Sequence, residues 1–321
     1  MRGLRVLVTG PDGFVGRHLI RELHAAGAVT LGAGVGDADD LQASGNLAEW
    51  QRCDITDAGS VRSMVALARA DAIVHLAGQA SATSSFADPI ATFRANALGT
   101  MHLLEAAWLE APRARLLVIG TSEIYGPQPP GTRTPEDARL RPVSPYGLSK
   151  AAADAAADFY ARVRGLQVIR TRSFGHLGPG QDERFAIPEF ARQIAAIEAG
   201  EGEPVLRVGN LEVTRDLTDV RDVVAAYLAL LERGRPGAAY NVCRGEGVEL
   251  SSIVRFLCEK SRRPVRIEVD RKRLRPADLP YLVGDPAAIQ NDTGWGATRS
   301  VEAAVLEVLE EWRQRLAKRA S

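Results

Sequence analysis

The first half of the chain alternates short apolar runs with stretches of helical periodicity. Each apolar run is nearly continuous, which is typical of a strand that is covered on both faces of a sheet. The predicted strands are residues 4–9, 28–31, 72–76, 116–119 and 167–171. The predicted helices between them are residues 18–26, 61–69, 91–109 and 148–164. This alternation predicts an α/β fold with a doubly wound parallel sheet.

The pattern becomes less regular after residue 172, where glycines, prolines and short segments prevail up to residue 218. The elements predicted beyond this point are helices at 187–198, 219–231, 250–260 and 300–316, and strands at 239–242 and 265–269. We therefore predict a first domain over residues 1–172, to which residues 219–242 return. A smaller α/β domain comprises residues 173–218 and 243–321. In such folds ligands bind at the carboxyl ends of the strands.

Composition and charge narrow the classes of partner. The chain has 45% hydrophobic and 25% charged residues, and its 40 basic and 40 acidic side chains cancel. This balance gives no bulk attraction to nucleic acid or to an anionic membrane. No stretch approaches the ~20 apolar residues that a membrane span requires. Cys53, Cys243 and Cys258 are far apart, predict neither a disulfide framework nor a metal site, and favour a reducing cytoplasm.

A glycine-rich turn follows the first predicted strand directly. Gly10, Gly13 and Gly16 are spaced three residues apart, and a predicted helix begins there. Glycine permits a tight turn and a close approach of the backbone, while free amides at a helix N-terminus bind a pyrophosphate. The pattern predicts that the first domain binds a dinucleotide, NADP or NAD. The predicted cradle consists of Gly10, Asp12, Gly13, Phe14, Val15 and Gly16.

The sequence gives fewer signals for the residues that bind the adenosine end of the dinucleotide. An acid at the tip of the second strand would bind the 2′-hydroxyl of NAD, and an arginine would favour the 2′-phosphate of NADP. Residues 32–36 read Gly-Ala-Gly-Val-Gly and supply neither. Asp37 is equally well explained as a solvated loop acid. Asp54 and Ile55, after the next strand, are the candidates to flank the adenine.

A phenol and an ammonium four residues apart form the candidate reactive centre. Tyr146 and Lys150 share one face of a helix. A nearby ammonium, helped by a nicotinamide cation, is expected to lower the pKa of the phenol. The phenol would then exchange a proton with a sugar or alcohol oxygen near neutral pH. Thr121 or Ser122, at the end of the strand over 116–119, would hydrogen-bond the same oxygen, although Ser122 is also a plausible turn cap.

Together these motifs resemble the extended short-chain dehydrogenase/reductase family, in its nucleotide-sugar-modifying branch, over nearly the whole chain. The resemblance implies a Rossmann fold, an NADP or NAD cofactor, and catalysis by Thr121, Tyr146 and Lys150. It also favours a homodimer, formed by the small-residue faces of helices 91–109 and 149–164. The further cofactor contacts that it implies are Leu76, Ala77, Gly78 and Asn96.

The second half resembles the GDP-mannose branch of that family, on residues 172–181, 208–212, 215–222, 240–243, 274–278, 284–286 and 293–295. The resemblance implies a GDP-linked hexose substrate. It favours NAD(P)H-dependent reduction of the 4-keto group of GDP-4-keto-6-deoxy-D-mannose to GDP-D-rhamnose. The alternatives are 4,6-dehydration of GDP-mannose and 4-epimerisation of another nucleotide sugar. The compact length suits a reductase, because the dehydratases usually carry inserted segments. Glu123 does not distinguish a reductase from a dehydratase, since enzymes of both classes can carry an acid at this position.

Candidate substrate contacts lie mainly in the Gly- and Pro-rich segments. Guanidinium groups match phosphate oxygens, and the resemblance implies that Arg215 and Arg275 clamp the diphosphate while Asp278 contacts the ribose. Arg207 is expected near the base or the ribose. Gly175 stands where the reductase pattern usually has asparagine. The predicted substrate set is Ser81, Ser122, Gly175, Arg207, Arg215, Arg275 and Asp278.

Overall fold

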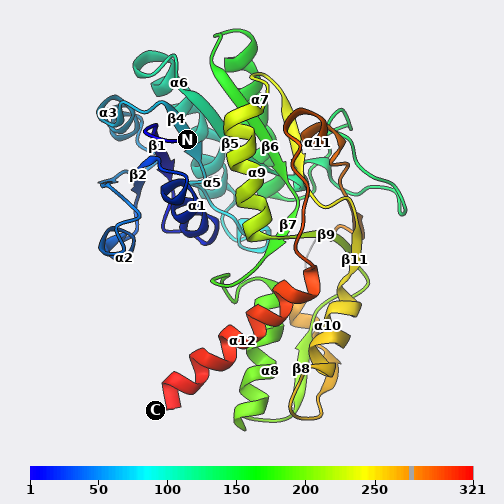
Figure 1. The fold of residues 1–321 in the computed structure, drawn as a ribbon. Coiled ribbons are helices and arrows are strands. Elements are labelled where there is room, and N and C mark those ends of the chain that lie inside the picture. Colours follow the sequence, from blue (N-terminus) through cyan, green and yellow to red (C-terminus); the bar gives the residue numbers. More distant parts are fainter. Residues whose placement is uncertain (275–277, 321) are drawn as a thin grey trace.

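Seven parallel strands form the central sheet of the computed structural model, which describes residues 1–274 and 278–320 (Figure 1). The strands run in the order β10-β6-β5-β4-β1-β2-β3. Their bounds are β1 (Arg5–Thr9), β2 (Val29–Gly34), β3 (Glu49–Arg52), β4 (Ala72–His75), β5 (Arg115–Thr121), β6 (Gln167–Ser173) and β10 (Ala239–Val242). The predicted doubly wound α/β fold is confirmed. The order reverses between β1 and β4, so their carboxyl ends border the crevice where such sheets bind ligands.

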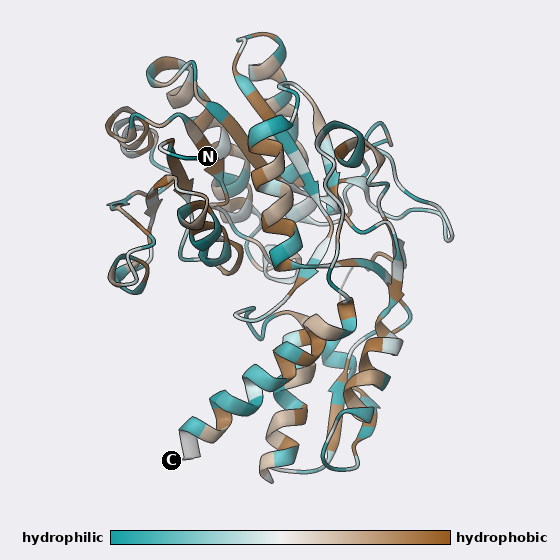
Figure 2. Cartoon of the chain, in the orientation of Figure 1, coloured by the Kyte–Doolittle hydropathy of each residue, from teal (hydrophilic) through white to brown (hydrophobic). Residues whose placement is uncertain are grey.

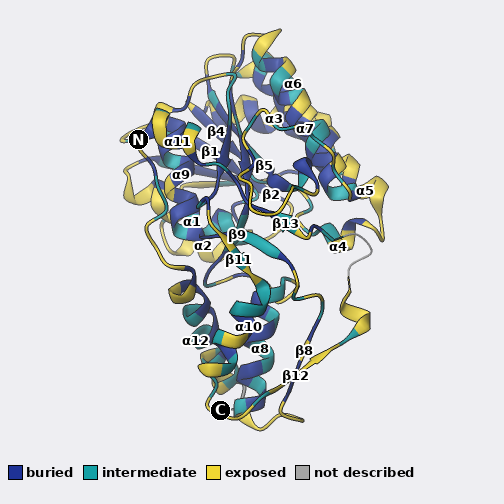
Figure 3. Ribbon diagram, turned by 90° about the vertical axis from the view of Figure 1, so that its right-hand side faces the viewer, coloured by how far each residue is buried: buried dark blue, intermediate teal, exposed yellow. Residues whose placement is uncertain are grey.

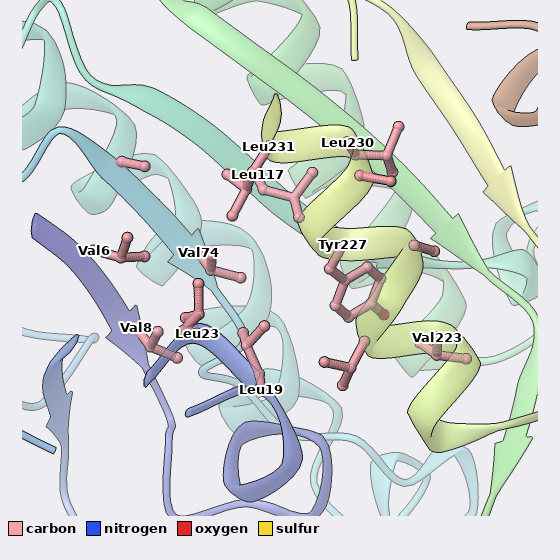
Figure 4. Close-up of a cluster of buried hydrophobic side chains, with 14 of the residues drawn as sticks. Val6, Val8, Leu19, Leu23, Val74, Leu117, Val223, Tyr227, Leu230 and Leu231 are labelled. Atoms are coloured by element: carbon pink, nitrogen blue, oxygen red, sulfur yellow. The ribbon is translucent and has the colours of Figure 1, made fainter. Parts of the chain in front are cut away.

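Helices cover both faces of this sheet, because the side chains of each strand point alternately to either face. One face is covered by α1 (Phe14–Ala25) and α9 (Val220–Arg233), and the other by α3 (Ala58–Ala68), α6 (Gly99–Glu110) and α7 (Pro145–Arg162). In β1, Val6 and Val8 join the core under α1 and α9, whereas Leu7 joins the opposite core. Figure 4 shows the first of these cores, with Leu19 of α1 and Tyr227 of α9 directed at the strands.

A second group of elements packs below the sheet in Figure 1. Its helices are α8 (Ala186–Ala199), α10 (Leu250–Glu259) and α12 (Val301–Ala320), and its strands are β8 (Val205–Val208) and β12 (Arg266–Val269). These elements share a separate apolar core. Apolar and polar residues alternate along α12 in Figure 2, as expected of a helix with one buried stripe. No helix in the described part of the chain is long and apolar enough to cross a bilayer.

The two groups are not simply consecutive in sequence. Helix α11 (Ala287–Thr293) lies against α9 and β10, and its Ile289 belongs to the core of the large sheet together with Trp295. A stretch from the last third of the chain therefore packs with the first half. The division that we predicted at residue 172 stays a prediction.

A small sheet connects the two groups. Its central strand β9 (Thr214–Asp219) pairs with β7 (Gly175–Leu177), β11 (Gly247–Glu249) and β13 (Tyr281–Leu282). Asp216 of β9 is buried and accepts hydrogen bonds from the backbone N–H groups of Arg244 and Gly245, both at 2.8 Å. Burial raises the pKa of Asp216 to about 6. This carboxylate joins the loop after β10 to the strand that carries Arg215.

The predicted helix over 91–109 is three consecutive elements. They are α5 (Pro89–Phe93), a π-helical turn (Arg94–Leu98) and α6. The helix that we predicted to begin at residue 148 begins at Pro145 instead. Proline is favoured in a first helical turn, and the Oγ of Ser144 accepts a hydrogen bond from the N–H of Gly147 at 3.0 Å. Tyr146 therefore lies in the first turn of α7.

Candidate active site

The turn between β1 and α1 is shaped by glycines at two close approaches. Gly10 has a φ of +70°, and a Cβ there would lie 3.1 Å from the Cα of Ala77. A Cβ on Gly16 would lie 2.6 Å from the Cα of Pro11. Gly13 occupies the N-cap position of α1 without a side-chain cap, which leaves amides of the first turn free for an anion. These features fit the pyrophosphate of a dinucleotide.

A buried histidine holds the turn after β4 against this cradle. His75 lies 2.8 Å from the Oγ1 of Thr9 through Nδ1 and 3.0 Å from the Oγ1 of Thr100 through Nε2. The N–H of Ala77 donates to the same Thr9 hydroxyl at 3.2 Å. Burial lowers the pKa of His75 to about 3, so the ring is neutral near neutral pH. The predicted residues Leu76 and Ala77 are thus fixed next to Gly10.

The π-helical turn links this region to α7. Asn96 donates from Nδ2 to the carbonyl of Gln79 and to the Oγ of Ser149, both at 3.0 Å, and its Oδ1 accepts from the N–H of Gln79 at 2.8 Å. A Cβ on Gly78 would lie 2.5 Å from this Oδ1 and 3.9 Å from the Nζ of Lys150. Three predicted cofactor residues, Gly78, Asn96 and Lys150, therefore lie together. Single π turns are common at functional sites.

Hydroxyl groups on both sides hold Tyr146 in place. Its N–H donates to the Oγ of Ser85 at 3.1 Å, and its carbonyl accepts from the Oγ of Ser149 at 2.8 Å. We did not predict either serine as a site residue. Ser149 is recognisable afterwards because it stands three residues after Tyr146, where a helical side chain can reach back. Ser85 lies far away in sequence and carries no such signal.

The Tyr146 phenol faces the end of β5. Burial and the carboxylate of Glu123 raise its pKa, while a hydrogen bond with Thr121 acts in the opposite direction. Lys150 donates from Nζ to the carbonyl of Ile119 at 3.0 Å, and burial lowers its pKa to about 8. Burial is the largest cause of the shift in the Tyr146 pKa, so the phenol keeps its proton near neutral pH. Our expectation that Lys150, helped by a nicotinamide cation, lowers this pKa stays a prediction.

Thr121 and Glu123 are positioned by a short 3₁₀ turn, Ser122–Tyr125, that follows β5. Thr121 caps this turn, and its Oγ1 accepts from the N–H of Glu123 at 3.3 Å. The Oγ of Ser144 donates to the Oε2 of Glu123, also at 3.3 Å. Ser122 is buried in the same turn. The structure thus brings Thr121, Glu123 and Tyr146 together at the carboxyl edge of the sheet.

The predicted substrate residues Arg215 and Asp278 form an ion pair. Nη2 of Arg215 donates to Oδ1 of Asp278 at 3.0 Å, and Nδ2 of Asn210 donates to its Oδ2 at 3.0 Å. Asp278 lines an open cavity of about 470 Å³. The other lining residues are Gly209, Asn210, Leu211, Glu212, Val269 and Leu274. A guanidinium beside a cavity of this size suits a phosphorylated ligand.

The remaining substrate candidates are more scattered. Arg207 extends from β8 to Glu268, 3.4 Å away, and is about half exposed. Ser81 caps α4 (Ala82–Ser85) by accepting from the N–H of Ser84 at 3.1 Å. Arg275 lies outside the described residues. At Gly175 a Cβ would lie 2.9 Å from the carbonyl oxygen of Asp216, so an asparagine would require β9 to move.

Asp54 and Ile55, which we predicted to flank the adenine, occupy the turn after β3. Oδ1 of Asp54 accepts from the N–H and the hydroxyl of Thr56 at 2.9 and 2.8 Å, and these hydrogen bonds lower the pKa of Asp54. Ile55 is buried, and a Cβ on Gly99 would lie 2.9 Å from its Cγ2. Both residues are separate from the reactive centre. No group of three His, Cys, Asp or Glu among the described residues is placed to hold a metal ion.

An aromatic stack connects the cradle to the second group of elements. The rings of Phe14 in α1 and His176 in β7 are 6.1 Å apart and nearly parallel, at 15°. Nε2 of His18 lies 2.9 Å from the carbonyl oxygen of Pro179. The glycine-rich turn therefore contacts the segment that leads from β7 toward α8.

Comparison with known proteins supports the same family. Residues 7–308 match the family described as GDP-mannose 4,6 dehydratase. A GDP-6-deoxy-D-mannose reductase from Pseudomonas aeruginosa is 33% identical over 315 residues, which cover 97% of this chain and 98% of the relative. A GDP-6-deoxy-D-talose 4-dehydrogenase from Aggregatibacter actinomycetemcomitans is 28% identical over 95% of this chain and 96% of the relative.

Solved structures resemble the chain over almost its whole length. The structure of RMD from Pseudomonas aeruginosa complexed with NADPH has a TM-score of 0.85 and 32% identity, covering 97% of this chain and 99% of the other. The UDP-glucose 4-epimerase of Thermus thermophilus, in complex with NAD, has a TM-score of 0.86 and 28% identity, with the same coverage.

Proposed function

Since the chain belongs to the extended short-chain dehydrogenase/reductase family, we propose that it is a nucleotide-sugar reductase. Its substrate is GDP-4-keto-6-deoxy-D-mannose, whose 4-keto group it reduces to give GDP-D-rhamnose with NADPH or NADH. The full-length similarity to a GDP-6-deoxy-D-mannose reductase supports this substrate. The pairing of Arg215 with Asp278 beside a cavity supports a diphosphate-linked ligand.

The observation that carries the proposal is the hydrogen bond between the phenol of Tyr146 and the hydroxyl of Thr121 at the carboxyl edge of the sheet. A reduced nicotinamide, when bound, supplies the hydride for the carbonyl carbon. Tyr146 donates its proton to the carbonyl oxygen as that oxygen gains negative charge. Thr121 hydrogen-bonds the same oxygen and orients it. Lys150 contributes positive charge close by, since its pKa of about 8 leaves it mostly protonated near neutral pH.

To test this, the purified protein is incubated with NADPH or NADH and with GDP-4-keto-6-deoxy-D-mannose, which a separate dehydratase produces. We expect loss of the reduced-nicotinamide absorbance in step with the formation of GDP-D-rhamnose. Conversion of GDP-mannose alone into the 4-keto-6-deoxy sugar, without net use of cofactor, would instead identify a dehydratase. Interconversion of another nucleotide sugar without net cofactor use would identify an epimerase.

We also propose a homodimer in the cytoplasm. Helix α7 contacts both α5 and α6, and the three helices expose large apolar side chains, among them Ile90, Met101 and Phe159. Figure 3 shows exposed residues along the outer side of these helices. Several large apolar side chains exposed on neighbouring helices are a feature of faces between protein chains. The three cysteines are free, as expected in a reducing compartment.

A further inference from the structure

The carboxylate of Asp12 lies across the end of β2, although Asp12 belongs to the turn after β1. A Cβ on Gly34, the last residue of β2, would lie 3.4 Å from Oδ1 of Asp12. A Cβ on Gly36 would lie 3.1 Å from Cγ of Asp12. A side chain from the glycine-rich turn therefore occupies the space that β2 itself leaves empty.

The end of β2 lies where the part that distinguishes NADPH from NADH, the 2′-phosphate on the adenosine ribose, is expected to bind. With the pyrophosphate on the first turn of α1, the ribose of the adenosine reaches the carboxyl end of β2. There a carboxylate accepts hydrogen bonds from the ribose hydroxyls, whereas it repels a 2′-phosphate. In this chain β2 ends at Gly34, and the following Val35 and Gly36 provide neither an acid nor a base. From outside this segment, the carboxylate of Asp12 approaches both Gly34 and Gly36.

The Asp12 carboxylate is not committed to another protein group. Within the described residues it makes no hydrogen bond and no ion pair. Only its backbone carbonyl is engaged, accepting from Nε of Arg17 at 2.9 Å. Nη1 of Arg17 forms an ion pair with Asp40. Arg52 lies opposite Gly34 in the β2–β3 register and is exposed, without an ion pair to Asp12.

We propose that Asp12 makes this enzyme prefer NADH over NADPH, by accepting hydrogen bonds from the adenosine ribose and by repelling a 2′-phosphate. The proposal rests on the proposed function, because it requires that a nicotinamide cofactor is bound. The similar structures do not settle the preference, since one is complexed with NADPH and another with NAD. The acid at the usual place on β2 is replaced here by an acid from the turn after β1.

The test measures the dissociation constants of NADH and NADPH by fluorescence titration, without any sugar nucleotide. The variants are Asp12→Asn, which keeps the shape and removes the charge, and Asp37→Asn, in the exposed loop beyond β2. We expect the unmodified protein to bind NADH at least about tenfold more tightly than NADPH. Asp12→Asn should reduce this ratio by about tenfold, chiefly through tighter NADPH binding, while Asp37→Asn should change it by less than about twofold.

Several outcomes would overturn the proposal. Equal or tighter binding of NADPH by the unmodified protein would do so, and so would a ratio that follows Asp37→Asn rather than Asp12→Asn. Both of these results leave the reductase itself standing. If the unmodified protein binds neither cofactor, the proposed function fails, and the role of Asp12 fails with it. Thermal unfolding of each variant checks that the substitutions leave the fold intact.

Discussion

At the scale of single residues, burial sets the charge states of Tyr146 and Lys150 in opposite senses. The pKa of the phenol is raised and that of the ammonium is lowered to about 8. Each group is shifted toward its neutral form, yet a pKa of about 8 leaves Lys150 mostly protonated near neutral pH, next to a neutral phenol. A neutral phenol suits the donation of a proton to a developing alkoxide, which is the direction of a reduction.

Replacing Tyr146 with phenylalanine tests the proton donor. The substitution removes the hydroxyl and keeps the ring, so we expect turnover of the 4-keto sugar to fall by about 10²–10⁴-fold. Binding of the reduced cofactor should stay within about threefold, since the contacts of Tyr146 with Ser85 and Ser149 are made by its backbone. Steady-state kinetics and fluorescence titration measure the two quantities. Turnover at the unmodified rate would exclude Tyr146 as the donor.

Replacing Lys150 with methionine tests how much the buried ammonium lowers the free energy of unfolding. The folded pKa of about 8 lies below the ordinary 10.5, so between these values the unfolded chain binds more protons and stability rises with pH. The full penalty applies below pH 8. We expect Lys150→Met to be more stable by roughly 1–3 kcal/mol near neutral pH, and the difference to vanish as the pH passes 10.5.

Urea unfolding of Lys150→Met across this pH range provides the measurement. The matched control is Lys272→Met, because Lys272 is exposed and its charge costs nothing to solvate. A constant difference between Lys150→Met and the unmodified protein at every pH would contradict the buried-charge account.

Parts of the site were predictable from the sequence. Residues that follow parallel strands lie at the same edge of the sheet, so motifs that are far apart in sequence come together there. Gly10, Gly78 and Lys150 come from distant segments and meet for this reason. The direction of the Tyr146 pKa was not predictable, since desolvation depends on packing that spacing does not reveal. The mutual pairing of Arg215 and Asp278 also requires three-dimensional proximity.

At the scale of elements, strands with a continuous apolar run or a clear alternation were predictable, including the exposed β12 within the strand predicted at 265–269. Strand β4 is apolar and fully buried, whereas β3 reads Glu-Trp-Gln-Arg at the edge of the sheet and has no apolar run. The short strands around β9 have only a few residues each, too few for a clear periodicity. The π-helical turn keeps a helical pattern and so was hidden within the helix predicted over 91–109.

The turn between β1 and α1 permits a matched test of its packing. A Cβ at Gly16 would press on the backbone of Pro11 at 2.6 Å, whereas a Cβ at Gly13 would meet only the carbonyl oxygen of Gly10, at 3.4 Å. The φ of Gly13 is −73°, which alanine readily adopts. We expect Gly16→Ala to cost about 1–3 kcal/mol in the free energy of unfolding, and Gly13→Ala less than about 1 kcal/mol. Equal losses in denaturant unfolding would count against the close approach at Gly16.

At the scale of the whole molecule, the outer face of α5, α6 and α7 determines our expectation for assembly. Met101 and Phe159 are each 44% exposed on this face. An arginine at either position would place a charge in the proposed interface, so we expect Met101→Arg and Phe159→Arg to sediment as monomers. The control is Leu67→Arg, because Leu67 of α3 is 68% exposed on a different helix. Sedimentation of the unmodified protein as a monomer would exclude the dimer.

The stack of Phe14 on His176 joins the region that we propose for the cofactor to the region that we propose for the sugar nucleotide. Phe14 belongs to the turn that fits the pyrophosphate, and His176 lies on β7, which pairs with the strand carrying Arg215. A ligand that fixes one ring limits the motion of the other, and such coupling is reciprocal. We expect each reactant to tighten the other by about fivefold or more, and Phe14→Ala to abolish this cooperativity in calorimetric titrations. Tight binding would then depend on the cofactor and the sugar nucleotide being present together, more than on which of them binds first.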